Sequence, residues 1–165
     1  MCPAKPKGDS DAERYRLMNA TRVSYTLESS LESVNKAEET AQDIATKSGF
    51  DSDETQRIAM AVREAAVNAV LHGNAYDPRK KVHIAFETAK DILTVTIRDE
   101  GKGLQNDDIP DPLAPENLLK QSGRGIFLIR AFMDEVRFRN MEPGTEITLI
   151  KRLSGEARDG KEASQ

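Results

Sequence analysis

Three polar side chains, Glu64, Asn68 and His72, are spaced one helical turn apart in the segment REAAVNAVLHG at residues 63–73. The apolar residues around them recur at helical intervals, so the segment is predicted to be a buried helix with a line of polar groups along it. A carboxylate beside apolar surface can accept a proton. An amide oxygen one turn along can bind Mg²⁺, which takes few protein ligands and completes its shell with phosphate and water. Glu64 and Asn68 therefore fit a helix along which a magnesium-bound nucleotide lies.

This helix is expected to be apolar on two sides, with the polar line between them. One side carries Ile58, Val62, Ala65 and Ala69, and the other carries Met60, Val67 and Leu71. An ordinary surface helix has one apolar face and a broad charged one. From spacing alone, a narrow solvent-exposed strip stabilised by i, i+4 pairs is an equal alternative to a ligand-binding line.

A glycine-containing segment that could approach a ligand follows an apolar strand pattern. The segment RDEGKG places Asp99 just before Gly101 and Gly103. Glycines let a ligand come close to the backbone. A carboxylate at Asp99 could accept a hydrogen bond from the exocyclic amine that distinguishes adenine from guanine. For this segment alone, a plain strand-ending turn is the alternative.

Two further glycine segments lie nearer the C-terminus. Gly123-Arg124-Gly125 precedes a helical pattern, and free backbone N–H groups at the start of a helix attract phosphate. A glycine hinge before the helix is the alternative. Gly144-Thr145 stands at the start of the last predicted strand and, taken alone, indicates only a hairpin turn.

Composition and motifs argue against several classes of protein. The 165-residue chain has a net charge of −4 and no Trp, so no nucleic-acid partner is expected. No apolar run reaches the roughly 20 residues of a membrane span and no signal peptide opens the chain, so a cytoplasmic protein without membrane attachment is expected. A P-loop and the HRD and DFG kinase motifs are missing. His72 and His83 lack metal-site spacing, and Leu128 replaces the third glycine of a dinucleotide fingerprint.

The periodicity of the chain predicts an α+β fold. We expect a two-layer α/β sandwich with a mostly antiparallel mixed sheet and helices on one face. Strands are expected at residues 22–27, 81–86, 92–97, 136–138 and 147–150, and helices at 31–45, from the cap at 51–53 to about 71, and from 123 onward. Residues 1–18 are predicted to be a flexible head, 19–153 one domain and 154–165 a flexible tail. The long polar stretch 104–122 is expected to be mobile.

Taken in order, these segments resemble the conserved boxes of the GHKL ATPases, which include gyrase-type ATPases, histidine kinases and mismatch-repair proteins. Glu64-x-x-x-Asn68 resembles their N box. The segments that resemble their glycine boxes are Asp99-x-Gly101-x-Gly103, Gly123-Arg-Gly125 and Gly144-Thr145. The likeness spans residues 20–152. EAAVNAVLHGNAYD and GRGIFLIRAFMDEVRF are most similar to the bacterial anti-sigma factors that are also serine-protein kinases. The resemblance implies a Bergerat fold, with ATP and Mg²⁺ between the helices and the sheet of an ATP-binding kinase domain at 19–153.

The resemblance also implies a role for each matching residue. Glu64 would be the catalytic base that receives the proton of the attacking serine, and Asn68 would bind Mg²⁺. Asp99 would contact the adenine amine. The other nucleotide-binding positions would be Gly101 and Gly103 at the base, Gly123, Arg124 and Gly125 in a lid over the phosphates, and Thr145 beside adenine. His72 is expected to be packed or hydrogen-bonded, without a catalytic role.

Protein partners follow from the same resemblance. They would be a small anti-anti-sigma (STAS-type) protein, on which a serine is phosphorylated, and a sigma factor that is held inactive. A homodimer is also implied, with sigma-factor contacts near the first strand and helix, at residues 20–45. Two alternatives remain open: an ATP-binding regulator that transfers no phosphate, and a serine kinase of a non-transcriptional phosphoswitch. A histidine-kinase fragment is disfavoured, because no helix with a phospho-accepting histidine precedes the ATP-binding segments.

Overall fold

The computed structural model describes residues 20–103 and 121–153. The predicted flexible head and tail lie outside the described residues. So do residues 104–120 of the stretch that was predicted to be mobile.

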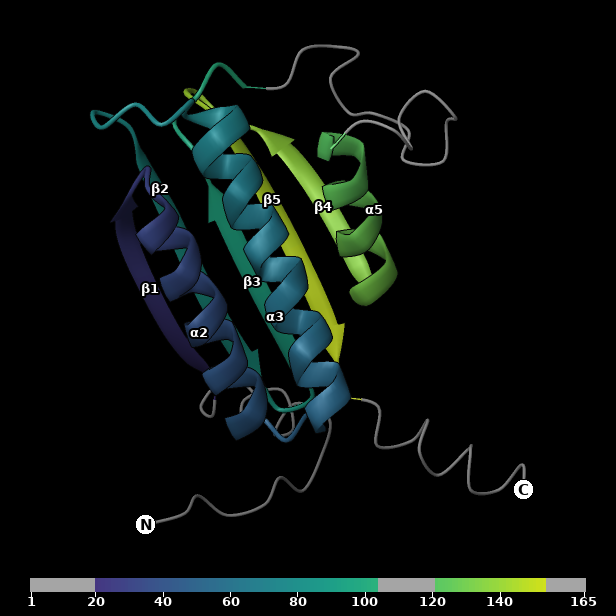
Figure 1. Cartoon of the computed structure of the whole chain (residues 1–165). Coiled ribbons are helices and arrows are strands. Elements are labelled where there is room, and N and C mark those ends of the chain that lie inside the picture. Colours follow the sequence, from purple (N-terminus) through teal and green to yellow (C-terminus); the bar gives the residue numbers. More distant parts are fainter. Residues whose placement is uncertain (1–19, 104–120, 154–165) are drawn as a thin grey trace, which may run out of the picture.

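A five-stranded sheet forms one layer of the molecule (Figure 1). Its strands are β1 (Thr21–Glu28), β2 (Lys81–Ala89), β3 (Ile92–Arg98), β4 (Glu135–Asn140) and β5 (Thr145–Arg152). They lie in the order β1-β2-β3-β5-β4, and all four pairings of the described strands are antiparallel. The predicted α+β sandwich is confirmed, and the sheet is antiparallel rather than mixed in the part of the chain that is described.

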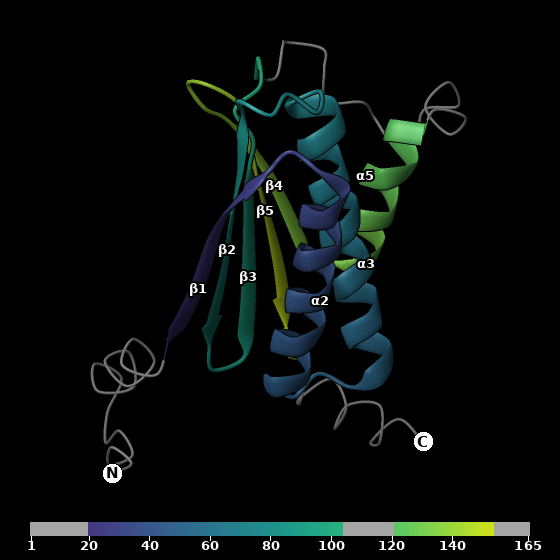
Figure 2. The same cartoon turned by 60° about the vertical axis from the view of Figure 1, so that its left-hand side comes forward.

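Three α-helices form the second layer, on one face of the sheet (Figure 2). They are α2 (Leu31–Lys47), α3 (Ser52–Val67) and α5 (Gln121–Phe132), and α3 continues as the π-helix η1 (Asn68–Gly73). Two of the helices start where the sequence offers a capping side chain. Ser30 Oγ accepts from the Ser33 N–H at 3.3 Å, and Asp51 Oδ1 accepts from the Glu54 N–H at 2.8 Å.

The hydrophobic core lies between the two layers, as the strand periodicity requires. In β3 every second residue is buried, which is the pattern of a strand with one face on the core. The largest fully buried side chains include Val34, Ile58 and Val62 from the helices and Phe86, Leu93, Ile97 and Leu149 from the strands. This core fixes α3 against the central strands and therefore fixes the polar groups that α3 carries.

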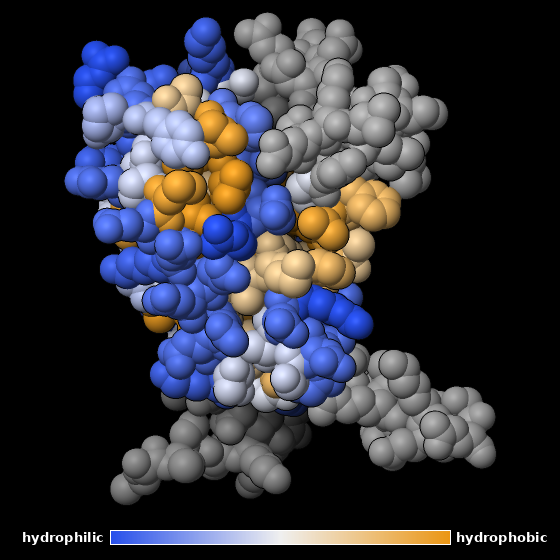
Figure 3. All heavy atoms as spheres, viewed as in Figure 1, coloured by the Kyte–Doolittle hydropathy of each residue, from blue (hydrophilic) through white to orange (hydrophobic). Residues whose placement is uncertain are grey.

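The outer side of α3 differs from the prediction. The first apolar side is buried as expected, but Met60 is 41% exposed and Leu71 is 38% exposed. Among the described residues, no further layer lies over the helices, so Met60 and Leu71 face solvent; Figure 3 shows this face as mainly hydrophilic with hydrophobic patches. The helix is apolar on two sides as its sequence indicates, but only the first side is part of the core. Within the described residues, no helix is long and apolar enough to cross a membrane.

Candidate functional site

Glu64 and Asn68 face the first turns of α5. Glu64 lies in the last turn of α3, Asn68 is the first residue of η1, and both are half-buried. A Cβ atom on Gly125 of α5 would lie 3.0 Å from Glu64 Oε2 and 3.7 Å from both Nδ2 and Oδ1 of Asn68. The carboxylate and the amide therefore share one space beside a helix backbone that has no side chain at the point of closest approach.

Helix α3 changes from α to π geometry at Asn68, and this was not predicted. Its hydrogen bonds lengthen in sequence there: the Asn74 N–H donates to the Ala69 carbonyl at 2.8 Å, and the Tyr76 N–H donates to the Val70 carbonyl at 3.0 Å. Short π segments inside helices are frequent at functional sites. Here the π segment begins at the candidate metal-binding amide and ends at Gly73, which lies against Asp99.

The Asp99 carboxyl is held by one of its oxygens only. Asp99 follows β3 and is 6% exposed. Its Oδ1 accepts from the Gly101 N–H at 2.9 Å and from the Thr145 N–H at 3.2 Å. Its own N–H donates to the Thr145 carbonyl at 3.0 Å. No hydrogen bond among the described residues reaches Oδ2, so that oxygen can accept a hydrogen bond from a ligand.

Burial also changes the acidity of this carboxyl. Desolvation raises the pKa of Asp99, and the hydrogen bonds from Gly101 and Thr145, with the positive charges of Lys80 and Arg98, offset only part of that effect. A perturbed carboxyl at the end of a strand, with one oxygen free, is typical of a binding or catalytic position.

Three glycines let the backbone close around Asp99. A Cβ on Gly73 would lie 2.3 Å from Asp99 Oδ2, one on Gly144 would lie 1.9 Å from the Asp99 carbonyl oxygen, and one on Gly101 would lie 2.1 Å from the Gly73 carbonyl oxygen. Real Cβ atoms do not approach so closely, so any side chain at these positions would displace its neighbours. The end of η1, the turn after β3 and the turn before β5 can therefore meet because glycine is present at each contact.

The remaining predicted positions lie around these two groups. Gly103 has φ +82, and a Cβ there would lie 2.7 Å from Asn140 Oδ1. Thr145 opens β5 and is half-buried. For Gly123 and Arg124 the structure describes only their place in α5, which starts at Gln121, two residues before the predicted start.

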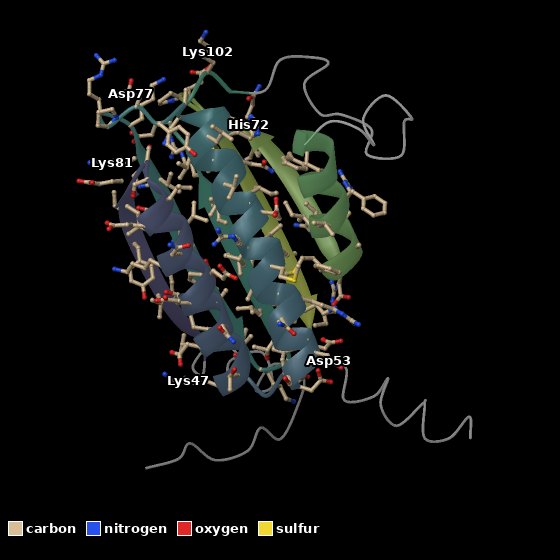
Figure 4. All side chains as sticks on the ribbon, viewed as in Figure 1. Lys47, Asp53, His72, Asp77, Lys81 and Lys102 are labelled. Atoms are coloured by element: carbon tan, nitrogen blue, oxygen red, sulfur yellow. The ribbon has the colours of Figure 1, made fainter. Side chains whose placement is uncertain are left out.

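Figure 4 places His72 at the end of the molecule that carries η1 and the turn after β3, opposite Lys47 and Asp53. The side chain is exposed, and no hydrogen bond of the described residues involves it. The expectation that His72 is packed or hydrogen-bonded is therefore wrong. The two residues after His72, Gly73 and Asn74, were not predicted as site residues. Their local sequence signal is a polar residue next to a glycine, which indicates no more than a turn.

A magnesium nucleotide fits these residues. The free Asp99 oxygen faces the space that a side chain on Gly73 would fill, and Gly125 leaves the space beside Glu64 and Asn68 clear. In the described part of the chain, no group of three His, Cys, Asp or Glu side chains could hold a metal ion. The Asn68 amide oxygen is a group that could hold Mg²⁺, an ion that commonly takes its other ligands from phosphate and water.

A sheet covered on one face by helices, with an acid–amide pair on one helix and a glycine-lined carboxyl after a strand, defines a class of nucleotide-binding domain. The family described as the histidine kinase-like ATPase domain matches residues 27–151, and the chain belongs to this family. The predicted resemblance to the GHKL group is confirmed.

Individual relatives narrow the comparison. The chain is 33% identical over 126 residues to the serine-protein kinase RsbW of Bacillus subtilis (strain 168), a match that covers 73% of this chain and 78% of the relative. It is 38% identical over 107 residues to the anti-sigma F factor of Anoxybacillus flavithermus, covering 62% and 72%. The predicted likeness to anti-sigma factors that are serine-protein kinases is confirmed by these names.

A solved structure shares the fold. The crystal structure of the RsbU and RsbW domains of a Mycobacterium tuberculosis protein aligns with a TM-score of 0.60 and 21% identity. The match covers 81% of this chain and 32% of the other, so the present chain spans about a third of that protein.

Proposed function

We propose that this protein is an ATP-dependent serine-protein kinase that also acts as an anti-sigma factor. The observation that carries the proposal is the placement of Glu64 and Asn68 beside Gly125, on the same helix that brings Gly73 against Asp99. An ATPase domain needs the base and phosphate ends of its nucleotide bound at once, and α3 with η1 connects groups suited to both ends. The relatives named serine-protein kinase and anti-sigma factor support the same activity.

In this proposal, ATP is recognised at both ends. The adenine amine donates to Asp99 Oδ2, the oxygen that no described residue bonds, while Gly101, Gly103 and Thr145 lie around the base. Gly123, Arg124 and Gly125 bind the phosphates, since the first turns of a helix favour negative charge. Asn68 holds Mg²⁺, which would neutralise charge on the phosphates when bound.

Glu64 is the proposed base. The hydroxyl oxygen of the substrate serine forms a bond to the γ-phosphorus, the bond from that phosphorus to the bridging oxygen breaks, and ADP leaves. Glu64 receives the serine proton. Phosphoryl transfer of this kind depends mainly on position and charge neutralisation, so one carboxylate beside the phosphate end supplies the proton acceptor that the step needs.

The proposed substrate is a serine of a small anti-anti-sigma (STAS-type) protein. Phosphorylation prevents that protein from binding the kinase, which leaves the kinase free to hold a sigma factor inactive. We include a homodimer in the proposal, and sigma-factor contacts at residues 20–45, which form β1 and most of α2.

Two other functions use the same site. An ATP-binding regulator without phosphotransfer would need Asp99 and Asn68 but no base, and the presence of Glu64 beside Gly125 favours the kinase. A serine kinase of a different phosphoswitch would differ only in its protein substrate.

Phosphotransfer to the anti-anti-sigma protein encoded nearest to this chain tests the proposal. The full chain, Mg²⁺ and γ-labelled ATP are incubated with that protein, and modified serine is identified by mass spectrometry. We expect one phosphoserine that depends on Mg²⁺. Binding of ATP without serine modification would support the regulator, and modification of an unrelated protein alone would support the other phosphoswitch.

A further inference from the structure

Asn74 is completely buried and uses its whole side-chain amide. It directly follows η1 and has 0% of its surface exposed. Its Nδ2 donates to Ser29 Oγ at 2.8 Å and to the Lys81 carbonyl at 2.9 Å. Its Oδ1 accepts from the Glu100 N–H at 2.8 Å. Two donated hydrogen bonds and one accepted one join it to three segments, two of which are distant in sequence.

The partners of Asn74 are linked to one another. Ser29 Oγ donates to the Lys80 carbonyl at 2.6 Å, and Glu100 Oε1 accepts from the Lys81 N–H at 2.8 Å. Glu100 Oε2 lies 3.0 Å from His83 Nε2. The turn before α2, the start of β2 and the turn after β3 are therefore connected through one side chain, and a buried network of this kind resists rearrangement.

The Glu100 N–H is the backbone donor that follows the candidate adenine-binding residue, Asp99. Gly73 directly precedes Asn74, and the carbonyl oxygen of Gly73 lies against Gly101 in the same turn. Asn74 thus fixes the turn that carries the Asp99 carboxyl. The residue before it, Gly73, lies directly against Asp99 Oδ2. A shift of this turn would move Oδ2 directly.

The backbone after Asn74 is strained. Ala75 has φ +50 and Tyr76 has φ +57, and both are in the left-handed region, which is unfavourable for a non-glycine residue. Such conformations persist where the surrounding structure enforces them, and they cluster at functional sites. Here they turn the chain immediately after Asn74 enters the network.

We propose that Asn74 is a positioning residue for base recognition: its hydrogen bond to the Glu100 N–H orients the Asp99 carboxyl so that Oδ2 accepts from an adenine amine. This rests on the proposed function, because it assumes that Asp99 reads the base. Guanine presents a carbonyl at the corresponding position, so a correctly oriented Oδ2 favours ATP over GTP. Loss of the orientation reduces that preference.

The test compares Asn74→Ala with Ser29→Ala in the full chain. Ser29 is 7% exposed and belongs to the same network, but it makes no contact with Glu100. Calorimetry gives Kd for ATP and GTP with Mg²⁺, and thermal unfolding gives Tm. We expect both variants to have a lower Tm. Asn74→Ala should lower the ratio of Kd for GTP to Kd for ATP about tenfold, as expected for one lost hydrogen bond, while Ser29→Ala keeps the wild-type ratio.

Three results would overturn the inference while leaving the proposed role of Asp99 in place. In the first, Asn74→Ala keeps the nucleotide preference of the wild type. In the second, Ser29→Ala loses it equally. If Asn74→Ala does not fold, Asn74→Asp decides, because it keeps an oxygen that accepts from the Glu100 N–H while the NH₂ donor is replaced by a second acceptor oxygen. This variant should keep the nucleotide preference, and its loss of that preference is the third result. A wild-type protein that binds ATP and GTP equally would instead remove the proposed role of Asp99, and the inference with it.

Discussion

Gly73 and Asp99 lie so close together that a Cβ on Gly73 would be 2.3 Å from Asp99 Oδ2 and 2.8 Å from Asp99 Cβ. The two residues come from the end of a helix and the end of a strand, and the π-helix η1 brings them together. The contact matters because Oδ2 is the oxygen that is free to receive a ligand. Any side chain at residue 73 would occupy that space or turn the carboxyl away.

Gly73→Ala is therefore expected to weaken ATP binding strongly. Gly73 is helical and its φ is not positive, so the backbone accepts alanine and the conflict falls on Asp99. Overpacking of this kind lowers the free energy of unfolding by about 1–3 kcal/mol. Turning the carboxyl away should also raise Kd for ATP about tenfold or more, as expected for a lost charge-assisted hydrogen bond. Calorimetry and urea denaturation measure the two effects.

Gly49→Ala is a matched control for stability. Gly49 has φ +97, so alanine there is strained by about 1–2 kcal/mol, yet the Cβ would meet nothing closer than Leu153 Cδ2 at 3.7 Å. It should lower stability and leave ATP affinity unchanged. Gly73→Ala with unaltered ATP affinity would show that the space beside Oδ2 is not used by the nucleotide.

Glu64→Gln is expected to separate binding from transfer. The amide keeps the shape of the side chain beside Gly125 but cannot accept the serine proton. We expect ATP affinity to stay near that of the wild type and the rate of serine phosphorylation to fall about 10²–10⁴-fold, the usual contribution of a positioned base. Glu54→Gln, near the start of the same helix, should change neither quantity. Loss of ATP binding in Glu64→Gln would assign Glu64 to the nucleotide rather than to the proton.

Asn68→Ala should weaken ATP binding in a metal-dependent way. If Asn68 holds Mg²⁺, its removal weakens the magnesium complex about tenfold, or about 1.4 kcal/mol, and affects ATP in EDTA much less. Calorimetric titration of both proteins with and without Mg²⁺ measures the difference. An equal loss under both conditions would indicate that the amide contacts the nucleotide itself.

The parts of the fold that depend on local periodicity were predicted from the sequence. Alternation in β2 and β3 indicates that one face of the sheet is buried, and Asp51 caps α3 at the predicted start of that helix. The outward exposure of Met60 and Leu71 was not predictable from the helix alone, because it depends on which other described elements pack on that side of the helix. Local pattern indicates which faces are apolar but not which are covered.

The site shows the same division. Glu64, Asn68 and Asp99 were predicted as site residues because their types and spacing suggest chemistry, and their roles stay predictions. Gly73 and Asn74 were missed, because their importance comes from contacts with the turn after β3, which no local pattern encodes. The π geometry of η1 was not predicted, because the apolar spacing of residues 65–71 fits an α-helix. The helix type depends on which backbone N–H groups donate to these carbonyls, and the spacing of apolar residues does not specify this.

The raised pKa of Asp99 predicts how ATP binding depends on pH. The protonated carboxyl cannot offer Oδ2 as a charged acceptor, so affinity should fall as pH decreases through the folded-state pKa, which lies above the ordinary value of 3.8. Asp99→Asn mimics the uncharged form and should bind ATP weakly at all pH values. Because the phosphates of ATP titrate equally with both proteins, the ratio of the two affinities isolates Asp99. We expect this ratio to shrink on acidification, beginning at a higher pH than for an unperturbed aspartate.

Stability should respond with opposite signs at Asp99 and its neighbour. The raised pKa of Asp99 gives a contribution to folding that is complete at low pH and is lost as pH rises through the folded pKa. The hydrogen bond with His83 lowers the pKa of Glu100 below its ordinary 4.5, so its contribution is present above that value and is lost as pH falls through the folded pKa. Urea denaturation between pH 3 and 7 should therefore show Asp99→Asn gaining stability relative to wild type as pH rises, and Glu100→Gln losing it. Parallel curves for Asp99→Asn and wild type would mean that burial does not perturb this carboxyl.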